Sequence, residues 1–434
     1  MASAGNSSSW SLWPLSRDAV FNFEILRPLS LSAYDGADVG EVLQAAAAIV
    51  PGDFESFAGA FGRLAARVYE RALAVAARAL RVPFSARTAF FSAATYFRSA
   101  DFFLPGDPAY PRLALLWQQP PDAFARGLAL LRPPGRRLTI HTPDFDIPCI
   151  WMTPPEAEDR RRPTLVVGNG YDGAQEELYH VVGAAALERG FNVLSYEGPG
   201  QPSVRRRQGL GFIPDWERVV TPVMDHVLAQ TRLVDADAVG LVGLSFGGYL
   251  APRAAAFDHR FAAVMALDGV WDFGPVMRAG FGPDMMRLHA AGRKAEFDAR
   301  ARSLFLSNSS SAPAASSSAR WGLEQGLWAF NTRSPFELVN LAAQYTLAPV
   351  VGRIATPVFV ADAEDELFFA GQPARLAAAL GPRLAHLHRF RQRDAAGAHS
   401  GLGALKLQNQ VMLDWFEDVI DDRRRRRNGT RSDL

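Results

Sequence analysis

The sequence has a single cysteine and no apolar run long enough to cross a membrane. One cysteine, Cys149, excludes an intramolecular disulfide and a metal cluster built on several thiolates. Its place in the apolar run 147–152 is typical of a small buried side chain. No segment approaches the ~20 apolar residues of a membrane-spanning helix. Residues 1–13 lack a basic start followed by an apolar stretch, so we expect no signal peptide and a cytoplasmic protein.

The chain also lacks an excess of charge. Its 434 residues include 46 lysines and arginines against 45 aspartates and glutamates, a net charge of +1. This balance argues against nucleic acid or an anionic membrane as a partner. We find no phosphate-binding loop, no dinucleotide fingerprint and no metal-ligand spacing among the eight histidines. The sequence therefore predicts no cofactor and no metal; the expected partner is a small molecule, with homodimer formation left open.

The second half of the chain contains apolar runs that alternate with helical segments. These runs occupy residues 164–168, 191–196, 239–244, 261–267 and 357–361. They follow a predicted antiparallel hairpin at 138–152. Such alternation is typical of an α/β protein with a parallel sheet covered on both faces. Residues 41–131 show apolar residues at three- and four-residue spacing instead, which predicts a helical N-terminal region.

The most informative motif is a serine between glycines, Gly243-Leu-Ser-Phe-Gly247, at the end of one apolar run. It matches a nucleophile elbow, a strained strand-to-helix turn that exposes a serine hydroxyl. Chance alone places this pattern in roughly one such chain in six, so its context decides. The alternative is a glycine-rich turn with an incidental serine. Because a strand is predicted before it and a helix after it, we predict Ser245 as a covalent nucleophile.

A nucleophilic serine needs a histidine base that is oriented by a carboxylate, here in the chain order serine, acid, histidine. Asp365 follows the predicted strand 357–361 and is the predicted acid. The alternatives are three acids in the same turn and one after the preceding strand: Asp362, Glu364, Glu366 and Asp268.

The predicted base is His399, in a loop of small residues before the last predicted helix. His386 and His388 alternate along the last predicted strand, residues 383–390, where packing is their expected role. Acyl transfer also needs donors for the developing oxyanion. We predict the backbone N–H groups of Phe246 and Tyr171.

The loop after the first parallel strand is also predicted to meet the substrate. Gly170 leaves room for the substrate beside the nucleophile, and Asp172 is the second predicted substrate-binding residue.

Several segments resemble those of fungal α/β-hydrolases encoded beside polyketide synthases. They are residues 169–177 (NGYDGAQEE), 196–201 (YEGPGQ), 215–217 (DWE), 243–249 (GLSFGGY) and 96–104 (YFRSADFFL). This group includes polyketide-shortening hydrolases of conidial pigment pathways and hydrolases of the fusarin and cytochalasan pathways, with bacterial pseudooxynicotine hydrolases as more distant relatives. The resemblance implies an α/β-hydrolase fold, a triad of Ser245, Asp365 and His399, and a helical N-terminal region that packs over the catalytic domain.

We therefore expect three regions. Residues 1–135 form a helical N-terminal cap or arm, residues 136–270 and 346–434 the catalytic domain, and residues 271–345 a lid insertion. The insertion contains a serine-rich run at 307–318, predicted as a surface loop. Five consecutive arginines at 423–427 are predicted as a solvated, frayed end, with an interaction tail as the alternative.

The expected function is hydrolysis of a polyketide or polyketide–amino-acid metabolite through an acyl-enzyme at Ser245. An acyltransferase or cyclase with the same triad is one alternative. A catalytically silent scaffold that binds a metabolite is the other.

Overall fold

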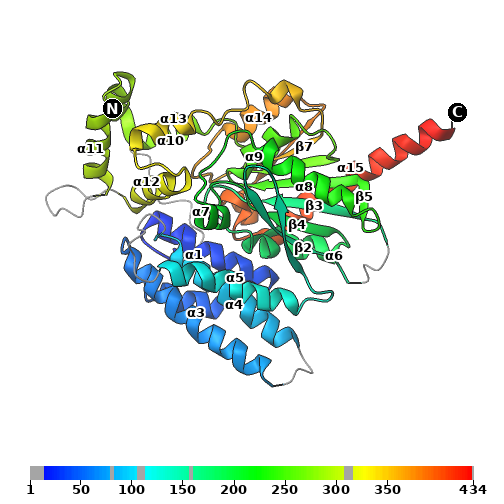
Figure 1. The fold of residues 1–434 in the computed structure, drawn as a ribbon, viewed down its shortest axis with the longest axis horizontal. Coiled ribbons are helices and arrows are strands. Elements are labelled where there is room, and N and C mark those ends of the chain that lie inside the picture. Colours follow the sequence, from blue (N-terminus) through cyan, green and yellow to red (C-terminus); the bar gives the residue numbers. More distant parts are fainter. Residues whose placement is uncertain (1–13, 79–82, 105–112, 156–159, 307–315, 433–434) are drawn as a thin grey trace.

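An eight-stranded sheet lies at the centre of the protein in the computed structural model (Figure 1). The structure describes residues 14–78, 83–104, 113–155, 160–306 and 316–432. The strands are β1 (Arg136–His141), β2 (Asp146–Met152), β3 (Arg162–Gly168), β4 (Asn192–Tyr196), β5 (Val234–Leu244), β6 (Ala263–Leu267), β7 (Val358–Ala363) and β8 (Ala385–Phe390). Their spatial order is β1-β2-β4-β3-β5-β6-β7-β8.

The sheet is antiparallel at one edge and parallel elsewhere. β1 pairs with β2 and β2 with β4 in antiparallel fashion, whereas the remaining neighbours are parallel. The predicted hairpin and the predicted parallel sheet are thus confirmed. Because the parallel strands run in one direction, their carboxyl ends meet at one edge, where ligands bind in open α/β sheets.

Helices cover both faces of the sheet because its strands are apolar on both sides. In β3, Leu165 and Val167 face one core, and Val166 between them faces the other. The helices packed around the sheet include the short π-helix η2. They are η2 (Tyr179–Gly183), α6 (Ala184–Glu188), α7 (Pro202–Gln208), α8 (Glu217–Ala229), α9 (Gly247–Ala255), α14 (Gln372–Leu380) and α15 (Leu405–Ser432). Short 3₁₀ turns lie at η3 (Val351–Arg353), η4 (Gln392–Asp394) and η5 (His399–Gly401).

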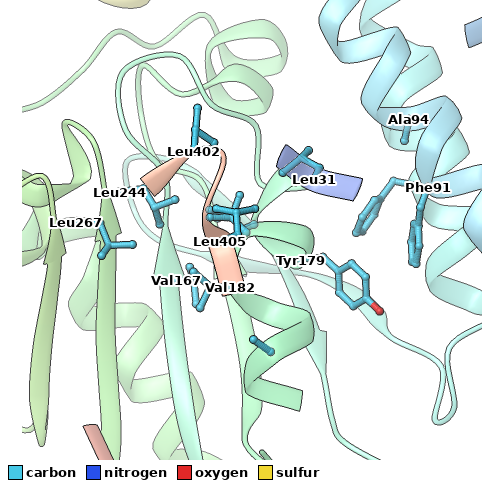
Figure 2. Close-up of a cluster of buried hydrophobic side chains, with 14 of the residues drawn as sticks. Leu31, Phe91, Ala94, Val167, Tyr179, Val182, Leu244, Leu267, Leu402 and Leu405 are labelled. Carbon is cyan, nitrogen blue, oxygen red and sulfur yellow. The ribbon is translucent and has the colours of Figure 1, made fainter. Parts of the chain in front are cut away.

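The N-terminal helices lie together beside the sheet, coloured blue to cyan in Figure 1. They are α1 (Ala19–Leu31), η1 (Ser32–Tyr34), α2 (Val39–Ala46), α3 (Phe54–Ala76), α4 (Pro83–Asp101) and α5 (Leu113–Ala129). Figure 2 shows how their core continues into that of the sheet: Leu31 and Phe91 lie in one cluster with Tyr179, Val167 and Leu405. The helical prediction for this region is confirmed.

Helix α1 is also hydrogen-bonded to the loop that follows η5. The Asp18 carboxylate caps its N-terminus by accepting a hydrogen bond from the Phe21 N–H. Near its other end, the Ser30 hydroxyl accepts a hydrogen bond of 2.6 Å from the N–H of Gly403, just beyond η5. The first described helix thus contacts a loop more than 370 residues later in the chain.

Within the described residues, four α-helices separate β6 from β7, and they lie together in Figure 1. They are α10 (Gly274–Ala290), α11 (Lys294–Phe305), α12 (Ser317–Ala329) and α13 (Pro335–Ala342). They fall within the predicted insertion 271–345. Residues 307–315 of the predicted serine-rich loop lie outside the described residues, and Ser317 and Ser318 begin α12.

The five arginines at 423–427 correct one prediction. They are exposed, as expected, but they continue helix α15 and do not form a frayed end. Arg424 forms an ion pair with Asp235 at 2.8 Å, and Arg427 forms one with Asp237; both aspartates lie in β5.

Among the described helices, none combines the length and the apolar character that a membrane span requires.

Candidate active site

The turn that carries Ser245 has the geometry of a strained elbow. β5 ends at Leu244, α9 begins at Gly247, and Ser245 between them has a φ of 56°. Non-glycine residues rarely adopt this left-handed conformation, and it persists only where the surroundings enforce it. A Cβ at position 243 would overlap the carbonyl oxygen of Gly247, so the close approach of strand and helix requires a glycine there.

The structure brings His399 to the serine, as predicted. Its Nε2 lies 2.9 Å from the Ser245 hydroxyl, and the histidine is 4% exposed. Its ring contacts Phe23 of α1 and Phe368 of the loop after β7, with ring centroids 5.9 and 5.0 Å away. The imidazole is thus held beside the hydroxyl with aromatic rings packed against it.

The carboxylate on the other side of His399 is Glu366, which corrects the predicted acid by one residue. Both Glu366 carboxylate oxygens lie within 2.9 Å of His399 Nδ1. Asp365 donates its backbone N–H to Gly397, and its side chain lines a neighbouring cavity with Lys406. The turn after β7 therefore sends consecutive acids in different directions, Glu366 to His399 and Asp365 to the neighbouring cavity. The N–H groups of Phe368 and Phe369 also donate to Glu366, at 2.8 and 3.1 Å.

A second carboxylate, that of Asp268 after β6, also reaches this histidine. Its Oδ2 lies 3.4 Å from His399 Nδ1. Ser400 donates to it from its N–H at 3.0 Å and from its hydroxyl at 2.5 Å. Asp268, the predicted alternative after the preceding strand, thus joins the site as a second negative group beside Glu366.

These contacts shift the pKa values of all three groups. Burial alone would lower the pKa of His399, but Asp268 and Glu366 outweigh it and raise that pKa to about 9. Burial would raise the pKa of Glu366, but His399 and the donated hydrogen bonds lower it to about 2. Burial, reinforced by Glu366, raises the pKa of Asp268 to about 7 against the opposing effect of His399. Glu366 is therefore the ionised partner of the histidine.

The same three side chains also form the candidate metal-binding group among the described residues. Their ligand atoms lie within 4.8 Å of one another. Both ring nitrogens of His399 are already engaged, however, Nδ1 by Glu366 and Nε2 by Ser245. The geometry therefore suits a proton relay rather than a metal site.

The loop after β3 runs directly over the elbow. A Cβ at Gly170 would lie 2.7 Å from the Leu244 carbonyl oxygen and 2.9 Å from the Ser245 Cβ. The Asn169 and Gln201 side chains hold this loop: Asn169 accepts from the Gly170 N–H at 2.9 Å, and Gln201 donates to the Asn169 carbonyl at 2.7 Å. Two of the segments noted in the sequence, 169–177 and 196–201, thus meet at this loop.

The predicted oxyanion donors, the N–H groups of Phe246 and Tyr171, belong to the elbow and to the loop that runs over it. A Cβ at Gly170 would be 2.8 Å from the Phe246 nitrogen, which places the loop and the elbow N–H side by side. Within the described residues, the N–H groups of Phe246 and Tyr171 donate to no protein acceptor. The Tyr171 hydroxyl donates to the Gly322 carbonyl of α12 at 3.2 Å, so the loop is also tied to the insertion.

Asp172 belongs to a buried ion-pair network. Its carboxylate accepts a hydrogen bond of 2.9 Å from Arg27 of α1, and its carbonyl accepts one of 2.5 Å from Arg98 of α4. Arg27 also donates to Glu177 through two nitrogens, at 2.8 and 3.0 Å. The predicted substrate-binding carboxylate is therefore already engaged by a cation, and it anchors the N-terminal helices to the loop beside Ser245.

A cavity of about 340 Å³ opens at Ser245 and His399. Its walls come from α1, α10, α12 and the loop after β7, and they include the rings of Phe23, Phe273 and Trp321. Glu24 of α1 also lines the cavity. The Ser245 hydroxyl thus faces a mainly apolar space that α1 and helices of the insertion enclose.

Glu24 and Arg27 were not predicted as site residues. The available signal was two charged residues, three positions apart, inside a segment that is otherwise largely apolar, residues 19–31. Buried charges of this kind occur where they are paired or functional. Glu366 and Asp268 were among the alternative acids, and only the packing of the turns distinguishes them from Asp365.

Comparison with known proteins gives relatives along almost the whole chain. The model of the prolyl oligopeptidase family matches residues 219–314. The hydrolase LUC6 of a Fusarium species is 31% identical over 93% of this chain and 97% of its own length. The 20-hydroxy-prefusarin hydrolase FUS2 of Gibberella moniliformis is 29% identical over 92% of this chain and 96% of its own length.

Solved structures show the same fold. The 2,6-dihydroxy-pseudo-oxynicotine hydrolase superposes with a TM-score of 0.66 at 19% identity, covering 91% of this chain and 95% of that one. AbyA5 superposes with a TM-score of 0.56 at 16% identity, covering 82% of this chain and 88% of that one. These likenesses and the sheet order confirm the predicted α/β-hydrolase fold.

Proposed function

We propose that this chain, which belongs to the fungal α/β-hydrolase family of secondary-metabolite gene clusters, cleaves an acyl bond through a triad of Ser245, His399 and Glu366. Membership of this family makes the chain a hydrolase. The single observation that carries the triad is the continuous relay from Glu366 through His399 to the serine hydroxyl, with bonds of 2.8 and 2.9 Å.

The reaction follows from this geometry. As the Ser245 oxygen attacks the acyl carbon, its proton passes to His399 Nε2, and Glu366 stabilises the imidazolium that forms. The N–H groups of Phe246 and Tyr171 stabilise the oxyanion. His399 then protonates the leaving group, and an acyl-enzyme remains on Ser245. Water, deprotonated by His399, attacks the acyl-enzyme and releases the acid, and the proton returns to the serine.

The substrate we propose is a hydrophobic polyketide or polyketide–amino-acid metabolite. The aromatic walls of the cavity support an apolar acyl chain. The name of the relative FUS2, a 20-hydroxy-prefusarin hydrolase, supports a secondary metabolite. In this proposal the N-terminal helices serve as a cap and residues 271–345 as a lid, since α1, α10 and α12 all contribute to the cavity wall.

A fluorophosphonate probe tests the nucleophile. We expect the unmodified protein to be labelled, and Ser245→Ala and His399→Ala to lose labelling. Unfolding midpoints measured on the same preparations show whether each variant is folded. Labelling that persists in folded Ser245→Ala protein would overturn the assignment.

A second measurement tests the substrate class. Metabolites from a strain that lacks the gene are compared with those from the strain with the gene restored. We expect a polyketide-derived ester, thioester or ketone to accumulate and the purified enzyme to cleave it in buffer without an added alcohol or amine. A strict need for such an acceptor would identify an acyltransferase instead.

A further inference from the structure

Glu24 presents a buried carboxyl group to the cavity that the proposed reaction does not use. It lies on α1 with 4% exposure and lines the same cavity as Ser245 and His399. The hydrogen bond it accepts, from Arg27 to its Oε2, is long, at 3.5 Å. Within the described residues, its other oxygen has no hydrogen-bond partner in the protein. This oxygen is therefore free to meet a bound molecule.

The charges around Glu24 balance without it. Arg27 pairs with Asp172 and Glu177, and Arg98 and Arg206 pair with Asp101. Three arginines thus face three carboxylates. Glu24 would be a fourth carboxylate, with only a 3.5 Å contact to the already paired Arg27, so its ionisation would leave the buried network with an excess of negative charge.

The carboxyl group of Glu24 therefore keeps its proton at neutral pH. Burial raises its pKa to about 8, and Asp172 and Glu177 reinforce that shift against the opposing effect of Arg27 and Arg98. A protonated carboxyl group is a hydrogen-bond donor, whereas its ionised neighbours can only accept.

We propose that Glu24 is a specificity-determining residue that donates a hydrogen bond from its neutral carboxyl group to a carbonyl or hydroxyl oxygen on the substrate's acyl chain. This inference rests on the proposed function, because it assigns a role within the same cavity. Apolar contacts between the cavity walls and an acyl chain are not directional, so they do not fix the position of the chain along the cavity. One donor at a fixed point on α1 selects chains that carry an oxygen at the matching distance from the scissile bond, and it positions that bond at Ser245.

Binding to the Ser245→Ala protein tests this role without turnover. The probes are the N-acetylcysteamine thioesters of hexanoic, 4-oxohexanoic and 5-oxohexanoic acid. The first has no ketone on its chain, and the other two carry one ketone at different distances from the thioester. At pH 7 we expect one oxo thioester to bind about 10-fold more tightly than the hexanoyl thioester, as measured by titration calorimetry. Glu24→Gln keeps a neutral donor and should keep this preference. Glu24→Leu removes the donor and should abolish it.

The pH dependence distinguishes a titrating donor from a shape effect. Above pH 8 the preference should fall in the protein with Glu24 and persist in the one with Glu24→Gln. A preference that survives in Glu24→Leu, an equal affinity for all three thioesters, or no binding of any of them would overturn the proposal. Failure of the proposed function is seen separately, as persistent fluorophosphonate labelling of Ser245→Ala, which does not depend on Glu24.

Discussion

Asp268 and Glu366 approach the same nitrogen of His399 from the ends of two neighbouring parallel strands. Their oxygens lie 3.4 and 2.8 Å from Nδ1, and β6 and β7 are paired in the sheet. Glu366 is also held by two backbone N–H groups, whereas Asp268 is held by Ser400. In the proposed mechanism the two acids therefore have different roles: Glu366 orients the imidazole, and Asp268 is a second carboxyl group that raises the pKa of the ring.

The assignment of the triad acid predicts opposite outcomes for two neighbouring acids. Glu366→Gln should lower kcat for p-nitrophenyl butyrate by about 10³- to 10⁴-fold, because the amide no longer stabilises the imidazolium. Asp365→Asn is the matched control and should change kcat by less than about threefold, since its side chain lies in another cavity. A large loss in Asp365→Asn with little loss in Glu366→Gln would restore Asp365 as the acid.

Asp268 should set the pH at which the enzyme becomes active. The pKa of His399 is about 9, so kcat/KM should rise with pH as the imidazole loses its proton. Asp268→Asn removes one of the two charges that favour the protonated ring. Its pH–rate profile should therefore move to lower pH by roughly one unit. Asp365→Asn serves as the control, and coincident profiles for Asp268→Asn and the unmodified enzyme would contradict this role.

The absence of a side chain at Gly170 should be essential for catalysis. In Gly170→Ala the new methyl group would lie within 3 Å of the Leu244 carbonyl, the Phe246 nitrogen and the Ser245 Cβ. The loop must then move away from the elbow, and kcat should fall about 10²-fold or more as oxyanion donors are displaced. Gly352→Ala is the control, because a Cβ there meets nothing within 4 Å. A kcat within about threefold of the unmodified value would refute this role.

The buried network around Arg27 should contribute strongly to stability. Arg27→Met leaves Asp172 and Glu177 without their partner, and we expect a loss of about 3–5 kcal/mol in the free energy of unfolding by urea. Arg71→Met, which removes a half-exposed ion pair with Glu41, should cost less than about 1 kcal/mol. Equal effects of the two substitutions would show that the buried network adds no special stability.

Glu24 should make stability depend on pH in an unusual direction. Its pKa is about 8 in the folded protein against an ordinary value of 4.5, so the folded state binds its proton more tightly. The stabilisation is complete below about pH 4.5 and is lost as pH rises towards and through 8. In thermal unfolding, the melting temperature of Glu24→Gln should therefore rise relative to that of the unmodified protein between pH 5 and pH 9. A constant difference in melting temperature would contradict the shifted pKa.

The sheet and the position of the serine were predictable because both depend on local sequence. Apolar runs separated by helical segments specify parallel strands, and Gly243 and Gly247 mark the tight turn around Ser245. His399 was predictable for a similar reason, since it follows the last strand in a loop of small residues.

The acid and the network were not predictable because they depend on packing between distant segments. Asp365 and Glu366 are adjacent in one turn. The hydrogen bond from the Asp365 N–H to the Gly397 carbonyl fixes this turn so that Glu366 reaches His399. Arg27 pairs with Glu177, which lies 150 positions away in the chain, and Glu24 contacts Arg27. No local sequence pattern predicts contacts between such distant segments, so these ion pairs are seen only in the structure.

The bond between Ser30 and Gly403 has a consequence for how this enzyme is made. Helix α1, which lines the cavity, is synthesised well before its anchor, because Ser30 and Gly403 are 373 residues apart, and His399 lies just before that anchor. Contacts of such long sequence separation form late. During synthesis, α1 can therefore take its place beside Ser245 only after the segment that carries Gly403 and His399 has been made, so one wall of the cavity and the histidine are completed together.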